Sequence, residues 1–455
     1  MPKNIKMMIA VLALFGVQAF PGPSLAGADK RPLSLDEAVA AGLQSSPGLH
    51  SSQMRVDASA AKTRELAAGR LPSLRFSGGY TRLSEVPPFQ VSLPILPNPI
   101  VVSQNYFNSY ALRLGVQQPL FTGFRLEAGS ESARLLEKSA GLDLEKDRAE
   151  FIFAVKSAYW ALARVEEFEK AVAENVTQVR EHLKDVRAFF DQGLITKNEV
   201  LRTELQLSNA ELMAIDARNA VEVARTSLNS LIGWPLTSEL ELTTSAESLA
   251  AAIPAEEKAA EDATLTPSLI QTALADRPEL KSADFRIKAS EAGLKAAKSG
   301  WYPQVFLSGN YYYLNPNPRL MPASNKFYDT WDVGISLSFD IWNWGQTRSQ
   351  ARQAEAQLAQ ARDSRKLLSD QAVLEVTQSR LAMGQARQKT GVAGQAVDQA
   401  EENLRITLER FKQGVALNTD VLDAEVALLQ AKITRTQAAI DLALAQARLQ
   451  KALGH

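Results

Sequence analysis

Two long stretches without proline constrain this chain more than any other feature of its sequence. No proline occurs between Pro119 and Pro235, and none follows Pro322. Both stretches are rich in Ala, Gln, Glu, Arg and Leu, which are strong helix formers. Each is interrupted once by a Gln-Gly pair, and glycine favours the end of a helix. The sequence therefore predicts two helical hairpins, with longer helices at about 125–191 and 346–412 and shorter helices at about 196–232 and 418–453.

The length of the longer helices limits how they can fold. Each has some 67 residues and is roughly 100 Å long at about 1.5 Å per residue, whereas ordinary domain helices average about 11–12 residues. The apolar stripe of so long a helix must be covered along most of its length. We therefore expect the long helices to pack against other helices.

The two hairpins are copies of one unit. "FDQGLITKNEVL", which begins at Phe190, returns as "FKQGVALNTDVL" from Phe411, and 12 of the 44 aligned positions are identical. Upstream, "RLPSLRFSGGY" from Arg70 matches "WYPQVFLSGNY" from Trp301. This periodicity predicts an internal duplication. We expect a first repeat at 27–233, a linker at 234–265 and a second repeat at 266–455.

The first residues resemble an export signal. Lys3 and Lys6 precede an apolar stretch, and a small-x-small site follows it, so we expect residues 1–26 to be a signal peptide cleaved between Ala26 and Gly27. The apolar stretch has about 14 residues, fewer than the roughly 20 that a membrane-spanning helix needs. The sequence therefore predicts an exported protein without a spanning helix.

Composition argues against several function classes. The chain has no cysteine, which excludes disulfides, thiolate metal sites and a cysteine nucleophile. Its formal net charge of −1 gives no basic surface for nucleic acid. His50, His182 and His455 are far apart in sequence, so packing or solvated roles are expected for them. No Ser/His/Asp, zinc or phosphate-loop motif is present, and we predict neither an enzyme nor a cofactor or metal site.

Each long helix is preceded by a pair of segments with strand-like alternation. In "WDVGISLSFDI", residues 331–341, apolar residues alternate with small or polar ones at every position, which is typical of a half-buried strand. The pattern also fits a soluble sheet. However, strands of about 10–12 residues have the length of tilted membrane-crossing strands, and aromatic residues cluster at their ends as at membrane interfaces. We expect strands at about 72–83, 106–121, 302–314 and 331–342.

Four such strands cannot close a membrane barrel. An open sheet edge in lipid leaves backbone N–H and C=O groups unpaired, and the smallest membrane barrels have about eight strands. The chain must then oligomerise: two copies would supply eight strands to the barrel, and three copies would supply twelve.

The sequence resembles the outer-membrane efflux protein family of TolC-like channels. The resemblance covers nearly the whole chain after the signal peptide and rests on several motifs together: "PLSLDEAVAAGLQSSPGL", "QQPLFTG", "GLITKNEVL", "RPEL", "GWYPQVFLSGNY" and "GVALNTDVLDAE". It implies a mainly α fold with transmembrane β: a homotrimer whose twelve-stranded outer-membrane β-barrel continues into a periplasmic α-barrel. The linker and chain ends would form a belt around its middle.

The same resemblance implies a passive exit duct of an efflux or type I secretion system. The lower tips would dock onto a periplasmic adaptor protein, itself bound to an inner-membrane transporter. We assign the tips to Gly193, Leu194, Gly414 and Val415. The loop at about 84–105, which includes Asn98, and the loop at 315–329 would face the cell exterior.

Asp420 and Asp423 are the candidate pore constriction. They lie at i and i+3, on one helix face, where solvated acids favoured by the helix dipole would also be expected. The family resemblance favours the constriction. The basic residue that latches the closed end in the family is replaced here by Ala416, and a tyrosine is replaced by Phe411, which leaves Lys197 as a candidate partner.

Two alternatives stay open on sequence. A periplasmic adaptor also carries a helical hairpin, although it would have one hairpin flanked by β segments. The choice between small-molecule efflux and type I secretion depends on the pump. The last helix is expected to start at an N-cap formed by Asn418 or Thr419.

Overall fold

The computed structural model describes residues 31–87, 89–91, 94–95, 97, 100–103, 105–245 and 266–454. The predicted cleavage site at Ala26 and Gly27, the loop residue Asn98 and most of the linker lie outside the described residues.

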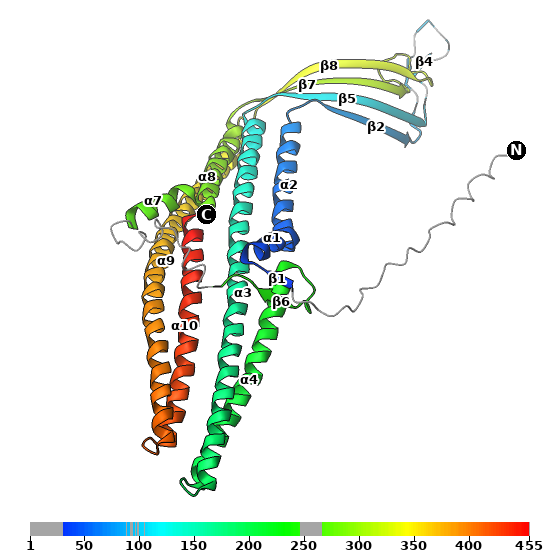
Figure 1. Cartoon of the computed structure of the whole chain (residues 1–455). Coiled ribbons are helices and arrows are strands. Elements are labelled where there is room, and N and C mark those ends of the chain that lie inside the picture. The colour runs from blue at the N-terminus through cyan, green and yellow to red at the C-terminus, as the bar shows by residue number, and fades with distance from the viewer. Residues whose placement is uncertain are drawn as a thin grey trace, which may run out of the picture.

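Two long helical hairpins form the body of the chain, and a sheet lies at one end of it (Figure 1). The first hairpin consists of α3 (Arg125–Asp191) and α4 (Lys197–Ile232), and the second of α9 (Gln346–Lys412) and α10 (Asn418–Leu453). All four helices agree with the predicted ranges to within one residue. In the described residues, no helix combines the length and the apolar character that crossing a membrane requires.

Shorter helices precede each hairpin. They are α1 (Leu35–Ser45) and α2 (Pro47–Ala68) in the first repeat, and α7 (Thr266–Asp276) and α8 (Pro278–Ala297) in the second. Of these, α2 and α8 run alongside the long helices up to the sheet (Figure 1). Ser34 and Glu37 form a capping box at the start of α1, and the Ser46 side chain caps α2 with Pro47 in its first turn.

The main sheet has four antiparallel strands in the order β2-β5-β7-β8. These are β2 (Ser73–Arg82), β5 (Asn108–Thr122), β7 (Gln304–Asn315) and β8 (Tyr328–Ser338). The first strand of the second repeat thus pairs with the second strand of the first repeat. β2 and β8 are the two outer strands of this sheet.

Two predictions about the strands were wrong in detail. The fourth strand ends at Ser338 rather than near residue 342, because its partner β7 begins at Gln304, opposite Ser338. The loop predicted at about 84–105 contains a small ladder of its own, β3 (Phe89–Val91) paired with β4 (Ile100–Ser103), which is separate from the main sheet. Its prolines lie outside those two short strands.

A hydrophobic cluster halfway along the hairpins fixes the chain ends to the helices. β1 (Arg31–Leu33) pairs in parallel with β6 (Leu240–Leu242), and both pack on Tyr159 and Trp160 of α3. The Tyr159 hydroxyl donates to the carbonyl of Leu33 and accepts from the N–H of Thr244. The start of the described chain and the beginning of the linker therefore lie together at mid-length, where a belt was expected.

Candidate functional site

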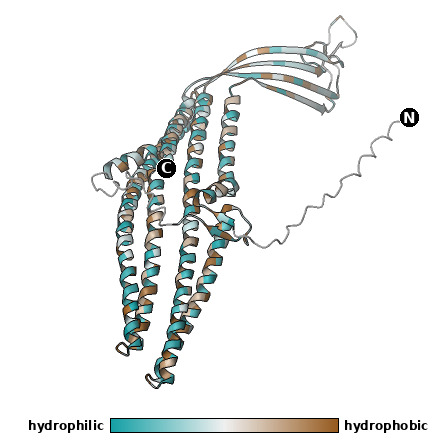
Figure 2. Cartoon of the chain, in the orientation of Figure 1, coloured by the Kyte–Doolittle hydropathy of each residue, from teal (hydrophilic) through white to brown (hydrophobic). Residues whose placement is uncertain are grey.

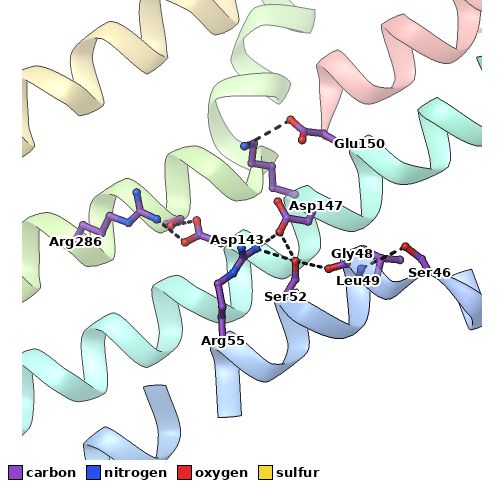
Figure 3. Close-up of polar contacts among 11 residues, drawn as sticks. Ser46, Gly48, Leu49, Ser52, Arg55, Asp143, Asp147, Glu150 and Arg286 are labelled. Atoms are coloured by element: carbon purple, nitrogen blue, oxygen red, sulfur yellow. Dashed lines mark hydrogen bonds and ion pairs between the residues drawn. The ribbon is translucent and has the colours of Figure 1, made fainter. Parts of the chain in front are cut away.

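The helices next to the sheet show the duplication as paired contacts on α3 (Figure 3). Arg55 of α2 donates to Asp147 of α3 at 2.6 Å, and Arg286 of α8 pairs with Asp143, one turn earlier on the same helix. Arg55 and Arg286 are equivalent positions in the alignment of the two repeats. The short helix of each repeat, α2 or α8, thus contacts α3 through an arginine at the equivalent position.

The two short helices differ in what covers their other side. Arg365 of α9 donates to Asp284 of α8 at 3.1 Å, so α8 lies between two long helices. The contacts of α2 with a long helix are to α3. Among the described residues, α2 therefore packs extensively on one long helix, whereas its repeat counterpart α8 packs extensively on two.

One face of the main sheet is apolar and exposed. Alternating brown and teal along the strands in Figure 2 shows the period of two. Leu74 and Ile335, on the two outer strands, are 69% and 70% exposed. The other exposed apolar residues of this face include Phe76, Tyr80, Leu112, Leu114, Tyr311, Trp331, Val333 and Leu337. A continuous exposed apolar face across four strands is expected to contact lipid or protein. Strands with one apolar and one polar face are typical of membrane barrels.

The hairpin tips have the same backbone geometry in both repeats. Gly193 and Gly414 have φ of +75° and +72°, a left-handed conformation that favours glycine. The N–H of the residue after each glycine, Leu194 or Val415, bonds to a carbonyl five residues earlier, as in a Schellman motif. Leu194 and Val415 are exposed. The four predicted tip residues therefore lie in the outermost turns, two in each hairpin.

A buried polar network joins the two hairpins near these tips. The Nε2–H of His182 in α3 donates to Oδ1 of Asn418 in α10 at 2.7 Å. The Asn418 Nδ2 donates to Glu199 Oε2 at 3.0 Å and to the Thr203 hydroxyl at 3.1 Å, both in α4. His182 and Asn418 are only 3% and 4% exposed. We call His182, Asn418, Thr203 and Glu199 the seam network.

An apolar cluster surrounds this network. Phe411 of α9 is buried, with its ring centroid 5.1 Å from that of His182 and 5.4 Å from that of Phe189. Side chains of all four hairpin helices contribute to the cluster: Leu183, Val186, Val200, Leu404, Val421, Ala424 and Leu428. Phe411 therefore acts by packing in the seam rather than through a hydroxyl.

The predicted N-cap of α10 was wrong. Asn418 is the first helical residue and its side chain enters the seam network. The cap position is Leu417, whose N–H donates to Oδ2 of Asp420 at 2.9 Å. The carboxylate of Asp420 thus satisfies a free N–H at the helix start, a role that the helix dipole favours.

Asp420 and Asp423 lie together on an exposed face of the first turns of α10. In the first hairpin the equivalent positions are Glu199, which faces Asn418, and Arg202. The acidic pair therefore belongs to the second hairpin alone. Lys197 forms no ion pair with it among the described residues of one chain, and its Nζ lies 5.8 Å from the centroid of Phe190 in its own tip.

Sequence reasoning missed one buried ionisable residue near the start of α10, Glu425. It is 1% exposed, and its Oε2 has no hydrogen-bond partner. Burial raises the pKa of Glu425 to about 7. Comparison of the repeats could have found it: the equivalent Glu204 pairs with Arg187 at 2.7 Å, whereas Leu408 stands at the arginine's position in the second hairpin.

Comparison with known protein families identifies the family of this chain. The model of the family described as outer membrane efflux protein matches residues 39–234 and 269–455, which is most of the chain in two copies. The chain belongs to the outer membrane efflux protein family. It is therefore an outer-membrane channel protein of the kind used in tripartite efflux and type I secretion, not an enzyme, and it extends into the periplasm. The alternative of a periplasmic adaptor is excluded.

Curated relatives include proteins of both transport types. The chain is 26% identical over 354 residues to the alkaline protease secretion protein AprF of Pseudomonas aeruginosa, covering 75% of this chain and 69% of that protein. It is 22% identical over 350 residues to the outer membrane efflux protein BepC of Brucella suis, covering 77% and 73%.

Solved structures have the same fold. The outer-membrane channel OprN matches with a TM-score of 0.73 and 21% identity, over 92% of this chain and 89% of that one. CusC matches with a TM-score of 0.77 and 16% identity, over 92% of each chain. Channels of this family form trimers within tripartite pumps.

Proposed function

We propose that this protein is the homotrimeric exit duct of a tripartite export system, spanning the outer membrane by a twelve-stranded barrel. The observation that carries the proposal is the four-stranded sheet at the end of the hairpins, with two unpaired outer strands and an exposed apolar face. Unpaired strand edges are not tolerated in lipid. Three copies close such a sheet into a barrel.

The duplication supplies the geometry of closure. Within one chain, Leu114 of β5 pairs with Tyr311 of β7. In the alignment of the repeats, Leu114 corresponds to Ile335 of β8, and Tyr311 corresponds to Tyr80 of β2. If the junction between copies repeats the junction within a copy, Ile335 lies opposite Tyr80 of the next copy. Both belong to the apolar face, as the period of two requires.

The same register accounts for the strand residues that the single chain leaves unpaired. It places Phe339 opposite Phe76 and Asp340 opposite Arg75 of the next copy. If the irregularity between Pro119 and Phe121 of β5 is repeated, Trp342 lies opposite Leu74. The alternation that predicted a strand to residue 342 is therefore completed by a neighbouring chain.

The helices also carry faces that a neighbour would cover. Leu367, Leu374 and Leu381 of α9 are exposed at heptad spacing, and α4 exposes a stripe that includes Leu201, Leu205 and Leu212. Heptad-spaced leucines are typical of packed helix pairs. The side of α2 that has no long helix against it would receive the next copy's α9, as α8 receives α9 within the chain.

The opposite end of the duct would meet its partners. Gly193, Leu194, Gly414 and Val415 would contact a periplasmic adaptor, itself bound to an inner-membrane transporter. Three copies would bring six such tips together. Asp420 and Asp423 would form the constriction there, with six carboxylates around one axis that attract cations.

Trimer migration and channel conductance test this function. The protein should fractionate with the outer membrane, migrate as a trimer until heated, and form cation-selective channels in planar bilayers. Replacing Asp420 and Asp423 by Asn should weaken that selectivity. A monomer without channel activity would overturn the proposal. The co-purified inner-membrane partner would identify the cargo.

A further inference from the structure

A row of hydrogen-bonded side chains crosses the polar face of the main sheet. Nε and Nη2 of Arg113 in β5 donate to Oδ1 of Asn310 in β7, at 3.0 and 2.7 Å. The Asn310 Nδ2 donates to Oδ1 of Asp332 in β8 at 2.8 Å. Arg319, between β7 and β8, donates to Oδ2 of Asp332 at 3.2 Å and to the Trp331 carbonyl at 2.9 Å. Three strands and a loop thus hold one continuous row.

The backbone leaves room for this row at one position. Gly115 stands opposite Asn310 in the ladder, and a Cβ built on it would lie 2.9 Å from the Asn310 Oδ1. A larger residue would displace the amide that holds Arg113. The guanidinium of Arg113 also lies 5.6 Å from the centroid of the Tyr312 ring. Arg113 is therefore held in place from two sides while its other N–H groups stay exposed.

The charges on this face do not cancel. Within the strands its charged residues are Arg75, Arg113 and Asp332, and Arg319 joins them from the loop. Asp340, just past the end of β8, has the phase of Asp332 and lies opposite Arg75 of the next copy in the register proposed above. Three cations then face two carboxylates, which leaves one net positive charge per chain. Arg75, Gly115, Asn310 and Asp332 occupy one row of the register across all four strands. The excess charge therefore lies at about one level of the sheet.

We infer that Arg75, Arg113 and Arg319 form an arginine belt inside the barrel that binds multivalent anions and makes the outer-membrane part of the duct favour anionic cargo. The inference rests on the proposed trimer, in which the polar face lines the lumen and the belt, with its aspartates, carries three net positive charges. Guanidinium groups bind carboxylate and phosphate by paired N–H groups, and low-dielectric walls concentrate the field of a charged pore. The belt has the opposite sign to Asp420 and Asp423 at the other end.

Planar bilayer recordings of the full-length trimer test the belt. Asp420→Asn and Asp423→Asn form the parent background, so that the acidic pair does not mask the arginines. In a potassium chloride gradient, Arg75→Gln, Arg113→Gln and Arg319→Gln together should lower the anion-to-cation permeability ratio by about twofold or more, as expected for loss of the belt's charge. Asp332→Asn should raise the ratio. Millimolar citrate in both chambers should block the parent and lose its effect in the arginine variant.

The matched control is Arg82→Gln. Arg82 lies at the end of β2 in the phase of the apolar face, where it donates to Asn108 and lies 5.1 Å from the Phe107 ring centroid. Within one chain the Arg75 side chain has no hydrogen bond among the described residues, so Arg75→Gln alone lowers the charge without breaking the row of Arg113, Asn310 and Asp332. The belt would be overturned if selectivity and citrate block changed in Arg82→Gln as much as in the belt variants. It would also be overturned if they changed in none of these variants. Absence of channels in the parent would instead contradict the proposed trimer.

Discussion

The Nε2 of His182 lies 2.7 Å from Oδ1 of Asn418, and this hydrogen bond joins the first hairpin to the second. His182 is nine residues from the end of α3, so the contact lies about 14 Å from the tip. It lies inside an apolar cluster built by all four hairpin helices. It therefore ties the two hairpins together close to their tips.

Asn418→Ala should loosen the seam. It leaves the His182 Nε2–H and the Thr203 hydroxyl without their amide partner, at a cost of about 1–3 kcal/mol for buried polar groups. The thermal melting midpoint of the helices in detergent should fall. Lys197→Ala, at the equivalent position of the first hairpin, is the control and should have little effect because Lys197 is exposed. Equal melting of the two variants would contradict the role of the network.

His182 should make the seam sensitive to acid. Burial lowers its pKa below the ordinary value of about 6.5, against a smaller opposing effect of the Asn418 hydrogen bond. The folded state thus resists protonation, and its stability falls as pH drops through about 6.5 towards the lowered pKa. The melting difference between wild type and His182→Gln should shrink between pH 7.5 and pH 5. A constant difference would show that His182 does not titrate in this way.

Glu425→Gln should stabilise the protein at high pH. Because burial raises the pKa of Glu425 from 4.5 to about 7, its folded state favours the protonated form, and stability falls as pH rises from about 4.5 through 7. The gain from Gln is about 3 kcal/mol at pH 8 and close to zero at pH 4. Melting of both proteins across this range measures it. Glu204→Gln, which breaks the exposed pair with Arg187, should give no such gain. A pH-independent difference for Glu425→Gln would refute this account.

Gly414→Ile should disturb the tip and reduce export. A β-branched residue at φ +72° is strained by about 1–3 kcal/mol, although a Cβ there meets no atom within 4 Å. The turn should rearrange rather than the bundle. Gly391→Ile is the matched control, since this exposed glycine lies inside α9 with ordinary helical geometry. Export by cells carrying each variant is the measurement, and full activity of Gly414→Ile would count against an adaptor-facing tip.

The helices could be predicted from the sequence because their signals are local. Proline placement, composition and one Gln-Gly pair per hairpin located α3 and α9 to the residue. Apolar alternation likewise found each strand of the main sheet. It could not find where β8 ends in a single chain, since that depends on where the neighbouring strand β7 begins.

The seam could not be predicted in the same way. Asn418 carries the sequence signal of an N-cap, but it is the first residue of the helix, and its amide turns towards His182, which is 236 residues away. The arginine belt also depends on pairing between strands of different repeats. Glu425 could be found from the sequence only by comparing the repeats. The first hairpin pairs Arg187 with Glu204, and the second has Leu408 in place of the arginine.

The central claim is that three chains close one barrel by pairing β8 of one copy with β2 of the next. The natural chain has no cysteine, so two introduced cysteines form an unambiguous probe. Tyr80→Cys combined with Ile335→Cys places one thiol on each outer strand, at positions that should face each other across copies. Each single variant, and the pair Tyr80→Cys with Val333→Cys, which is shifted by one residue pair along the same face, serve as controls.

Mild oxidation of purified trimers followed by heating in detergent is the decisive measurement. The account predicts that the 80/335 pair yields covalent dimers and trimers that a reducing agent separates, with much less cross-linking in the 80/333 pair and none beyond simple dimers in the single variants. Exclusively monomeric protein from the 80/335 pair, in a preparation that migrates as a trimer before heating, would contradict the β8–β2 junction.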